Sequence, residues 1–214
     1  MKKSILLLLA FVTTSCVNGY SRYYTQYVNE VFPQTENVEV ITVSADQYEE
    51  AGKKLISQNY IAIGESSFNG EYQGPTNAIN QAKKIGAEKV LIASNYTDQQ
   101  YFTVNGILTS KRRFDQRAVY FVKNPEKLRF GFYYELLSTD DMTKNGINYG
   151  LKVSIVINNS PVFDAGIVPG DILLELNGKK LFNLEDINRN ATETNIFKFL
   201  RNNKEFKATI NIRN

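Results

Sequence analysis

The side chains that could perform chemistry in this sequence are limited in kind. Its 214 residues include 22 carboxylates, 25 Lys and Arg side chains, a single Cys and no His. Without His, the sequence excludes Ser-His-Asp and Cys-His hydrolysis, His-ligated zinc and any acid–base shuttle through imidazole. An enzyme of this composition would depend on carboxylate, Lys or Tyr chemistry, and we expect no metal and no cofactor.

The glycine-rich segment 64–74 is the one candidate for a catalytic or anion-binding site in the first half. We expect it to be a loop between a strand and a helix. Its Glu71 stands where a phosphate-binding loop needs Lys, and the segment around Ser66 lacks the last Gly of a nucleophile elbow. Backbone N–H groups at the following helix could hold an anion, and Glu65 with Glu71 could form an acid–base pair. The favoured interpretation is structural: these residues shape a long turn and cap a helix.

The lone Cys16 follows an N-terminal segment with the proportions of a signal peptide. Met1 to Lys3 is basic, residues 5–12 are apolar, and the small residues 13–15 directly precede the Cys. The apolar run is too short to cross a bilayer. The arrangement resembles the lipobox of bacterial lipoproteins, in which the Cys becomes the acylated N-terminus of the mature chain. An ordinary secretory signal with an incidental Cys is the alternative.

Lipidation at Cys16 would make residues 1–15 a cleaved signal and residues 16–33 a tether. The resemblance implies a cell-envelope protein anchored to a membrane by its acyl chains. Because Val17 is not the Asp that retains enterobacterial lipoproteins in the inner membrane, the periplasmic face of the outer membrane is favoured. The tether contains four tyrosines that we expect to pack on the first domain: Tyr20, Tyr23, Tyr24 and Tyr27. The net charge of +3 predicts no nucleic-acid partner.

Residues 34–123 predict a small α+β domain of β-α-β-α-β type and of unknown function, built on a partly parallel sheet. Apolar runs predict strands and amphipathic patterns predict helices. The strands are 38–43, 60–63, 90–93 and 117–122, and the helices run from 45 to 58 and from 75 to 85. Ser44 is expected to cap the first helix and Gly86 to end the second. Asn105-Gly106, between apolar flanks, predicts a hairpin.

The second half contains a dense series of turn and capping signals between Ser160 and Gly178. Ser160-Pro161 predicts the start of a one-turn helix, and Gly166 its left-handed end. A tight turn at Pro169 to Asp171 should lead into a strand, and Asn177-Gly178 has the composition of a type I′ turn. Each signal is common alone, but the combination at these spacings is specific.

This run, NSPVFDAGIVPGDILLELNG from Asn159 onward, resembles the HtrA-type PDZ domain. The resemblance covers residues 127–213 and implies a partly open β-barrel with two helices. It also implies that the backbone N–H groups of the loop Arg129-Phe130-Gly131-Phe132 hold the terminal carboxylate of a peptide. The peptide would add as a strand beside residues 133–137, against the helix that Asn183 caps. The side chains implied to line the site are Arg129, Phe130, Phe132, Tyr134, Leu184 and Ile187.

These observations favour a lipid-anchored binding or adaptor protein without enzymatic activity, whose PDZ domain docks protein C-termini or extended peptides. Protease activity is not expected, because the first domain lacks His and is half the size of a trypsin-like double barrel. Tail-specific proteases carry most of their catalytic domain after the PDZ, whereas this sequence ends at Asn214. Two alternatives stay open: a structural envelope lipoprotein with a self-occluded PDZ groove, and a first domain that binds a small anion under PDZ regulation.

Overall fold

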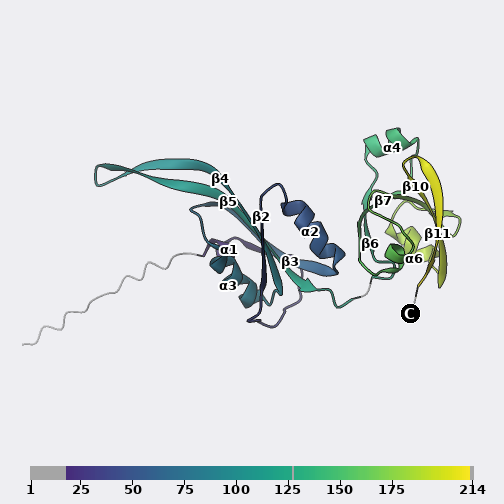
Figure 1. The fold of residues 1–214 in the computed structure, drawn as a ribbon, viewed down its shortest axis with the longest axis horizontal. Coiled ribbons are helices and arrows are strands. Elements are labelled where there is room, and N and C mark those ends of the chain that lie inside the picture. Colours follow the sequence, from purple (N-terminus) through teal and green to yellow (C-terminus); the bar gives the residue numbers. More distant parts are fainter. Residues whose placement is uncertain (1–17, 127, 213–214) are drawn as a thin grey trace, which may run out of the picture.

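The computed structural model describes residues 18–126 and 128–212, so the predicted lipidation site Cys16 lies outside the described residues. The described chain is an α+β protein with two open sheets (Figure 1). The helices are α1 (Gly19–Arg22), α2 (Tyr48–Ser57), α3 (Pro75–Ile85), α4 (Thr139–Asn145), α5 (Pro161–Asp164) and α6 (Leu184–Asn190). The strands of the first sheet are β1 (Tyr24–Gln26), β2 (Glu39–Val43), β3 (Tyr60–Gly70), β4 (Lys89–Val104) and β5 (Ile107–Lys123). Those of the second are β6 (Phe132–Leu136), β7 (Leu151–Val156), β8 (Ile172–Leu176), β9 (Lys179–Lys180), β10 (Thr194–Arg201) and β11 (Lys204–Asn211).

The first sheet has the order β1-β3-β5-β4-β2 and is covered on both faces. Strands β2 and β4 are parallel, as the predicted crossover requires, and the other pairs are antiparallel. Because side chains alternate along a strand, Val90 and Ile92 pack with Ala78 and Ala82 of α3, while Leu91 packs with α2 on the opposite face. Burial on both faces explains why these strands are continuous apolar runs.

Several predicted elements are confirmed in this unit. Helix α3 begins at Pro75, and Gly86 ends it with φ +74°. The Asn105-Gly106 turn joins β4 to β5, with positive φ at both residues. The predicted cap of α2 is wrong: Gln47 is the N-cap and makes no side-chain capping bond, because the Ser44 hydroxyl donates to the Gln47 side chain instead.

The predicted loop 64–74 is mostly strand, because β3 continues to Gly70 and pairs with β5 along its length. Only residues 71–74 connect it to α3. Gly64 is not a loop glycine: a Cβ there would lie 2.5 Å from the Tyr24 ring and 2.6 Å from the Thr25 carbonyl. The glycine therefore allows β1 to approach β3, a requirement that involves a distant segment and has no local signal.

The predicted tether 16–33 is folded from Asn18 onward. Helix α1 and strand β1 belong to the first unit, and β1 pairs with β3. Tyr20 is fully buried, with its ring edge-on to Phe68 at 5.0 Å. The expectation that these tyrosines pack on the first domain is thus confirmed for Tyr20, Tyr23 and Tyr24, whereas Tyr27 is half exposed.

The hairpin of β4 and β5 extends beyond the rest of the sheet. Strand β3 stops where Gly70 pairs with Phe114, but β4 and β5 stay paired out to Val104 and Ile107. The two-stranded extension projects away from both units (Figure 1). We call residues 97–113 the arm.

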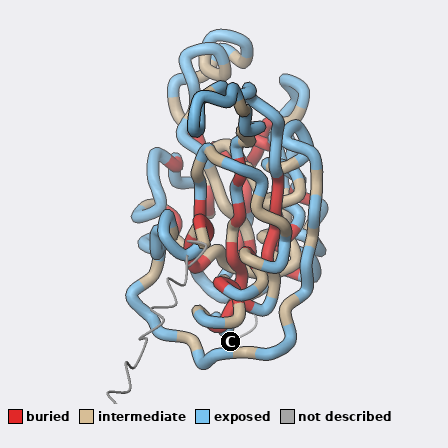
Figure 2. Tube along the Cα trace, turned by 90° about the vertical axis from the view of Figure 1, so that its left-hand side faces the viewer, coloured by how far each residue is buried: buried red, intermediate tan, exposed pale blue. Residues whose placement is uncertain are grey.

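The second sheet has the order β11-β10-β8-β7-β6, with β9 beside β8. Its core contains aliphatic and aromatic side chains from all parts of the unit, among them Leu151, Val162, Leu176, Ile187 and Phe197. Across the described chain, buried positions concentrate in the central parts of the strands, while most connecting segments are exposed (Figure 2). The predicted helix starts at Ser160 and Asn183 are confirmed, and α4 is a third helix that the sequence had not indicated.

The two units contact each other near the end of α2. The Asn158 N–H donates to the Ser57 carbonyl at 2.8 Å, and in the connection that follows β5 the Asn124 N–H donates to the Asn59 carbonyl at 2.9 Å. No helix within the described ranges is long and apolar enough to cross a membrane.

Candidate peptide-binding edge

Strand β6 lies at the edge of the second sheet and has an unpaired side. It pairs with β7 through five residue pairs, from Phe132↔Val156 to Leu136↔Leu151, and with no other strand of the described chain. The register shifts between Tyr133 and Tyr134, where β7 has one additional residue. The outer backbone groups of an edge strand are a template for pairing with another extended segment.

The loop before β6 directs its carbonyl groups into the protein. The Phe130 carbonyl accepts a hydrogen bond from Val162 N–H at 3.1 Å. The Gly131 carbonyl accepts from Ile157 N–H at 2.8 Å and from the Ser160 hydroxyl at 3.1 Å. By contrast, the amide N–H groups of Phe130 and Gly131 donate to no described residue. Both residues are buried, and a buried N–H group without an acceptor destabilises the fold. An anion or a water molecule that accepts from these two N–H groups would remove this cost.

Position 131 requires a glycine, because of both its backbone conformation and the close approach of neighbouring atoms. Its φ is +81°, in the left-handed region where glycine is favoured. A Cβ at this position would lie 2.1 Å from the Ser160 Cβ and 2.5 Å from its Oγ. The sequence identified Ser160 only as a helix cap, which it is, through the Phe163 N–H. Its bond to Gly131 joins segments 29 residues apart, and local sequence patterns contain no signal for it.

The aromatic side chains around the loop differ in exposure. Phe130 belongs to the core and meets the Phe197 ring edge-on at 5.2 Å. Phe132 and Tyr134 are only partly buried and pack against the same core. They lie on one face of β6, because side chains alternate along a strand. Phe130 is therefore a core residue beneath the candidate site. Phe132 and Tyr134 are the partly exposed aromatic side chains that a ligand could contact.

Helix α6 contributes one core residue and one exposed residue. Ile187 is 2% exposed and packs in the core, whereas Leu184 is 48% exposed at the first turn. Arg129 links the loop to the end of α6, because its guanidinium donates to the Ala191 carbonyl at 3.4 Å. The guanidinium is exposed, so its remaining N–H groups are available to an anion.

Two polar clusters position these elements. The Asn177 side chain donates to the Asn190 carbonyl at 2.9 Å and accepts from Ile196 N–H at 2.8 Å, which fixes the end of α6 against the sheet. Asp171 is fully buried and holds Arg201 through two bonds of 2.6 Å. This bidentate ion pair locks the turn before β8 to the end of β10.

The first unit does not assemble the acid–base site considered from the sequence. Glu65 and Glu71 are six residues apart along an extended segment, which separates them by about 20 Å. Glu71 forms an ion pair with Lys111 at 3.0 Å. Ser66 is buried and donates to the Tyr20 carbonyl at 2.6 Å, so its hydroxyl serves the fold.

Buried tyrosines in this unit stay neutral. Burial raises the pKa of Tyr20 to about 12, and burial also raises the pKa of Tyr120, whose hydroxyl lies 3.0 Å from that of Ser66. Neither phenol would ionise near neutral pH, and neither is an activated nucleophile.

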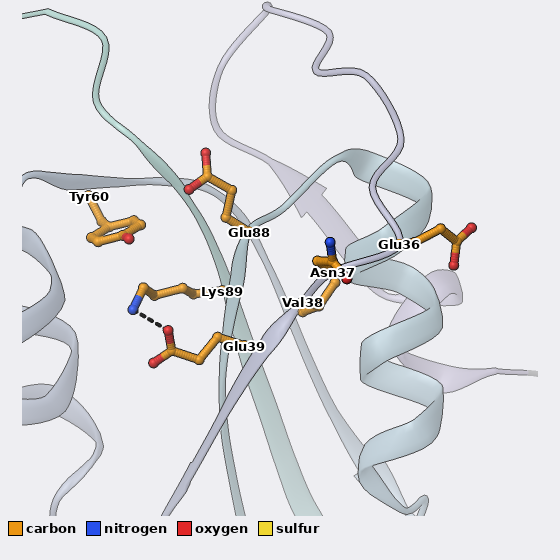
Figure 3. A pocket seen from close by; sticks show the side chains of 7 residues that line it. All are labelled: Glu36, Asn37, Val38, Glu39, Tyr60, Glu88 and Lys89. Carbon is orange, nitrogen blue, oxygen red and sulfur yellow. Dashed lines mark hydrogen bonds and ion pairs between the residues drawn. The ribbon is translucent and has the colours of Figure 1, made fainter.

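A hollow of about 470 Å³ on the first unit is lined by charged side chains (Figure 3). Glu39 and Lys89 form an ion pair there, while Glu36 points away from them and pairs with Lys83 at 2.8 Å. The hydrogen bond from Lys83 lowers the pKa of Glu36. Since these carboxylates are matched by lysines at the surface, the hollow has the character of a solvated salt-bridge cluster.

Comparison with known proteins finds neither a family model nor a curated protein that matches this chain. Among solved structures, the chain is similar to the HtrA3 PDZ domain bound to a phage-derived ligand (FGRWV), with 21% identity and a TM-score of 0.36. That similarity covers 39% of this chain and 83% of the other.

Two further solved structures are similar over a comparable share of the chain. The HtrA-type protease AlgW with decapeptide has 20% identity and a TM-score of 0.34, over 40% of this chain and 29% of its own. The PDZ domain of EpsC from Vibrio cholerae, residues 219–305, has 18% identity and a TM-score of 0.29, over 41% of this chain and all of its own.

Proposed function

We propose that the PDZ-type C-terminal unit, residues 128–212, binds the C-terminus of an extended peptide as an added strand beside β6. The observation that carries this proposal is the loop at Phe130 and Gly131. Its carbonyl groups are occupied by bonds into the protein, and its N–H donors have no partner among the described residues. A carboxylate is the ligand that satisfies such donors, through charge-assisted bonds about twice as strong as neutral ones.

Each part of the peptide would then meet a matching feature. Its backbone would pair with the free edge of β6, which supplies affinity independent of sequence. Its terminal side chain would contact the partly exposed rings of Phe132 and Tyr134, which favours an apolar residue. The exposed Leu184, at the other end of α6 from Arg129, would contact a residue further upstream.

The self-occluded alternative has no support in the described chain, because no segment pairs with the outer side of β6. The anion-binding alternative loses its proposed loop, since residues 64–70 are strand. The first unit is therefore proposed to act through its surface and not through a catalytic site.

The wider role that we propose rests on the sequence. The chain is proposed to be a lipoprotein anchored through Cys16 in the cell envelope, where it acts by binding, as an adaptor, and not by catalysis. The absence of His and the buried, hydrogen-bonded state of Ser66 support binding over hydrolysis.

Calorimetric titration of the chain from Val17 onward with peptides that end in an apolar residue tests the peptide-binding proposal. We expect micromolar affinity, about −8 kcal/mol at a Kd of 1 μM. Amidation of the peptide C-terminus should cost about 1.5–3 kcal/mol, because it removes the charged carboxylate that accepts hydrogen bonds from the N–H groups. Equal affinity for acid and amide forms would refute carboxylate binding. Absence of binding across a broad peptide library would refute the proposed function.

A further inference from the structure

The tip of the arm exposes apolar side chains on both faces of a two-stranded ribbon. Register places Phe102, Val104 and Ile107 on one face and Tyr101 and Leu108 on the other. Tyr101 is 65% exposed, and Ile107 and Leu108 are each 70% exposed. A ribbon that packs on a protein surface needs only one apolar face. A ribbon with apolar side chains on both faces is suited to an apolar environment that surrounds it on both sides.

Charge along the arm changes abruptly at the end of the tip. The twelve residues from Gln99 to Ser110 contain no charged side chain, and Lys111, Arg112 and Arg113 follow directly. Lys111 pairs with Glu71 at 3.0 Å, and Arg113 lies 3.9 Å from Asp98. The Arg112 guanidinium has no ion-pair or hydrogen-bond partner in the described chain. Since exposed ion pairs contribute little, all three cations can reorient toward an anionic surface.

We propose that the arm tip inserts into the headgroup layer of an anionic lipid surface, with the cations at 111–113 in contact with lipid phosphates. An apolar tip with adjacent Lys and Arg is the combination that binds membrane interfaces. The outer edges of the ribbon have unpaired backbone groups, which the hydrocarbon core would not tolerate, so insertion stays at interfacial depth. Tyr101 has the amphipathic character that is favoured at this depth.

The position of the chain's first described residues is compatible with this orientation. Tyr20 and Tyr23 pack on Phe68, two residues before β3 ends at the root of the arm. The C-terminal unit joins at the opposite end of the sheet, where Tyr60 pairs with Lys123. The arm would thus contact the membrane on the side away from the peptide-binding edge. The inference does not depend on a lipid at Cys16 or on peptide binding.

Vesicle co-sedimentation tests the proposal with the chain from Val17 onward, which retains every described residue and has no Cys to acylate. The probes are vesicles of phosphatidylcholine alone and of phosphatidylcholine mixed with phosphatidylglycerol. We expect binding to the mixed vesicles that weakens with added salt. The double variant Ile107→Ser/Leu108→Ser should bind at least tenfold more weakly, because it removes the two most exposed apolar side chains of the tip. Val31→Ser, which changes a side chain 88% exposed elsewhere on the first unit, should bind as the unmodified chain does.

A second set of variants separates specific contact from net charge. Lys111→Gln/Arg112→Gln/Arg113→Gln should lose the preference for anionic vesicles by about tenfold or more. The control Lys179→Gln/Lys204→Gln/Lys207→Gln removes the same charge from exposed positions of the C-terminal unit and should retain the preference. Peptide affinity should be unchanged in all arm variants, so the two proposals fail separately. No vesicle binding by the unmodified chain, or equal binding by the Ile107/Leu108 variant, would overturn the proposal. Self-association that depends on Ile107 and Leu108, without vesicle binding, would assign the tip to a second copy and would also overturn it.

Discussion

The Ser160 hydroxyl donates to the Gly131 carbonyl at 3.1 Å, and the same oxygen accepts the Phe163 N–H that starts α5. One side chain therefore caps a helix and clamps the loop in front of the edge strand. This bond fixes the Gly131 carbonyl toward the protein, and the amide N–H groups of Phe130 and Gly131 donate to no described residue. The motif that identifies the unit in the sequence thus also shapes its proposed site.

The close approach of Ser160 makes Gly131 intolerant of any side chain. We expect Gly131→Ala to lower the free energy of unfolding by about 2 kcal/mol or more, from left-handed strain and from overpacking against Ser160. Gly178→Ala is the matched control, since φ is +77° there and nothing lies within 4 Å of the added Cβ. It should cost only the strain, about 1–2 kcal/mol. Urea unfolding measures both, and equal losses would show that the Ser160 contact does not constrain the loop.

Substitution of Ile187 should mainly lower the stability of the fold, whereas substitution of Leu184 should mainly weaken peptide binding. Ile187→Ala should cost about 2–5 kcal/mol of stability, because Ile187 is a core residue. Leu184→Ala should cost less than about 1 kcal/mol of stability, since the side chain is half exposed, and should weaken peptide binding. Thermal melts and calorimetric titration of the two variants make the comparison. A stable Ile187→Ala variant with lost binding would place this residue in the ligand site instead.

Asp141 should make the C-terminal unit sensitive to acid. Hydrogen bonds from Lys152 and Ser138 lower the pKa of Asp141 to about 2, from an ordinary 3.8. The folded state therefore binds this proton less readily than the unfolded chain does. The stabilisation is complete above the unfolded pKa and is lost as the pH falls from about 4 toward 2. The free energy of unfolding, measured across this pH range, should fall more steeply with decreasing pH for the native chain than for Asp141→Asn. Parallel curves would contradict the assignment.

Cys16 should be the site of acylation in the proposed lipoprotein. Replacement of Cys16 by Ala should leave the precursor unprocessed and abolish labelling by radioactive fatty acid, because Cys16 is the one thiol in the chain. Labelling is followed in cells that express the native or variant protein. Undiminished labelling of the variant would end the lipoprotein hypothesis.

The sequence predicted correctly those helix starts and turns that depend only on a few neighbouring residues. The helix starts at Pro75, Ser160 and Asn183 and the turns at Asn105 and Asn177 are all found, since each depends on a few adjacent residues. The extent of β3 was not predicted, because Gly64 and the polar residues after it are typical of a loop. They are strand because β1 and β5 pair with them.

Long-range contacts also decided which site residues face a ligand. The resemblance implied that Phe130, Phe132, Leu184 and Ile187 line the site, but no local pattern showed which of them belong to the core. The structure divides them by burial, because Phe130 and Ile187 belong to the core, whereas Phe132 is partly buried and Leu184 is half exposed. The same limit applies to Ser160, whose contact with Gly131 spans 29 residues of sequence.

Hydrogen exchange at β6 tests strand addition most directly. Amide exchange is followed by NMR in the chain from Val17 onward, with and without a peptide that ends in a free carboxylate and an apolar residue. The account predicts that amides on the outer side of residues 132–136, together with those of Phe130 and Gly131, exchange more slowly when peptide is bound, because they then donate to it. Amides of β11, at the opposite edge of the sheet, should be unchanged. Peptide binding that leaves exchange at β6 unaltered would contradict the account.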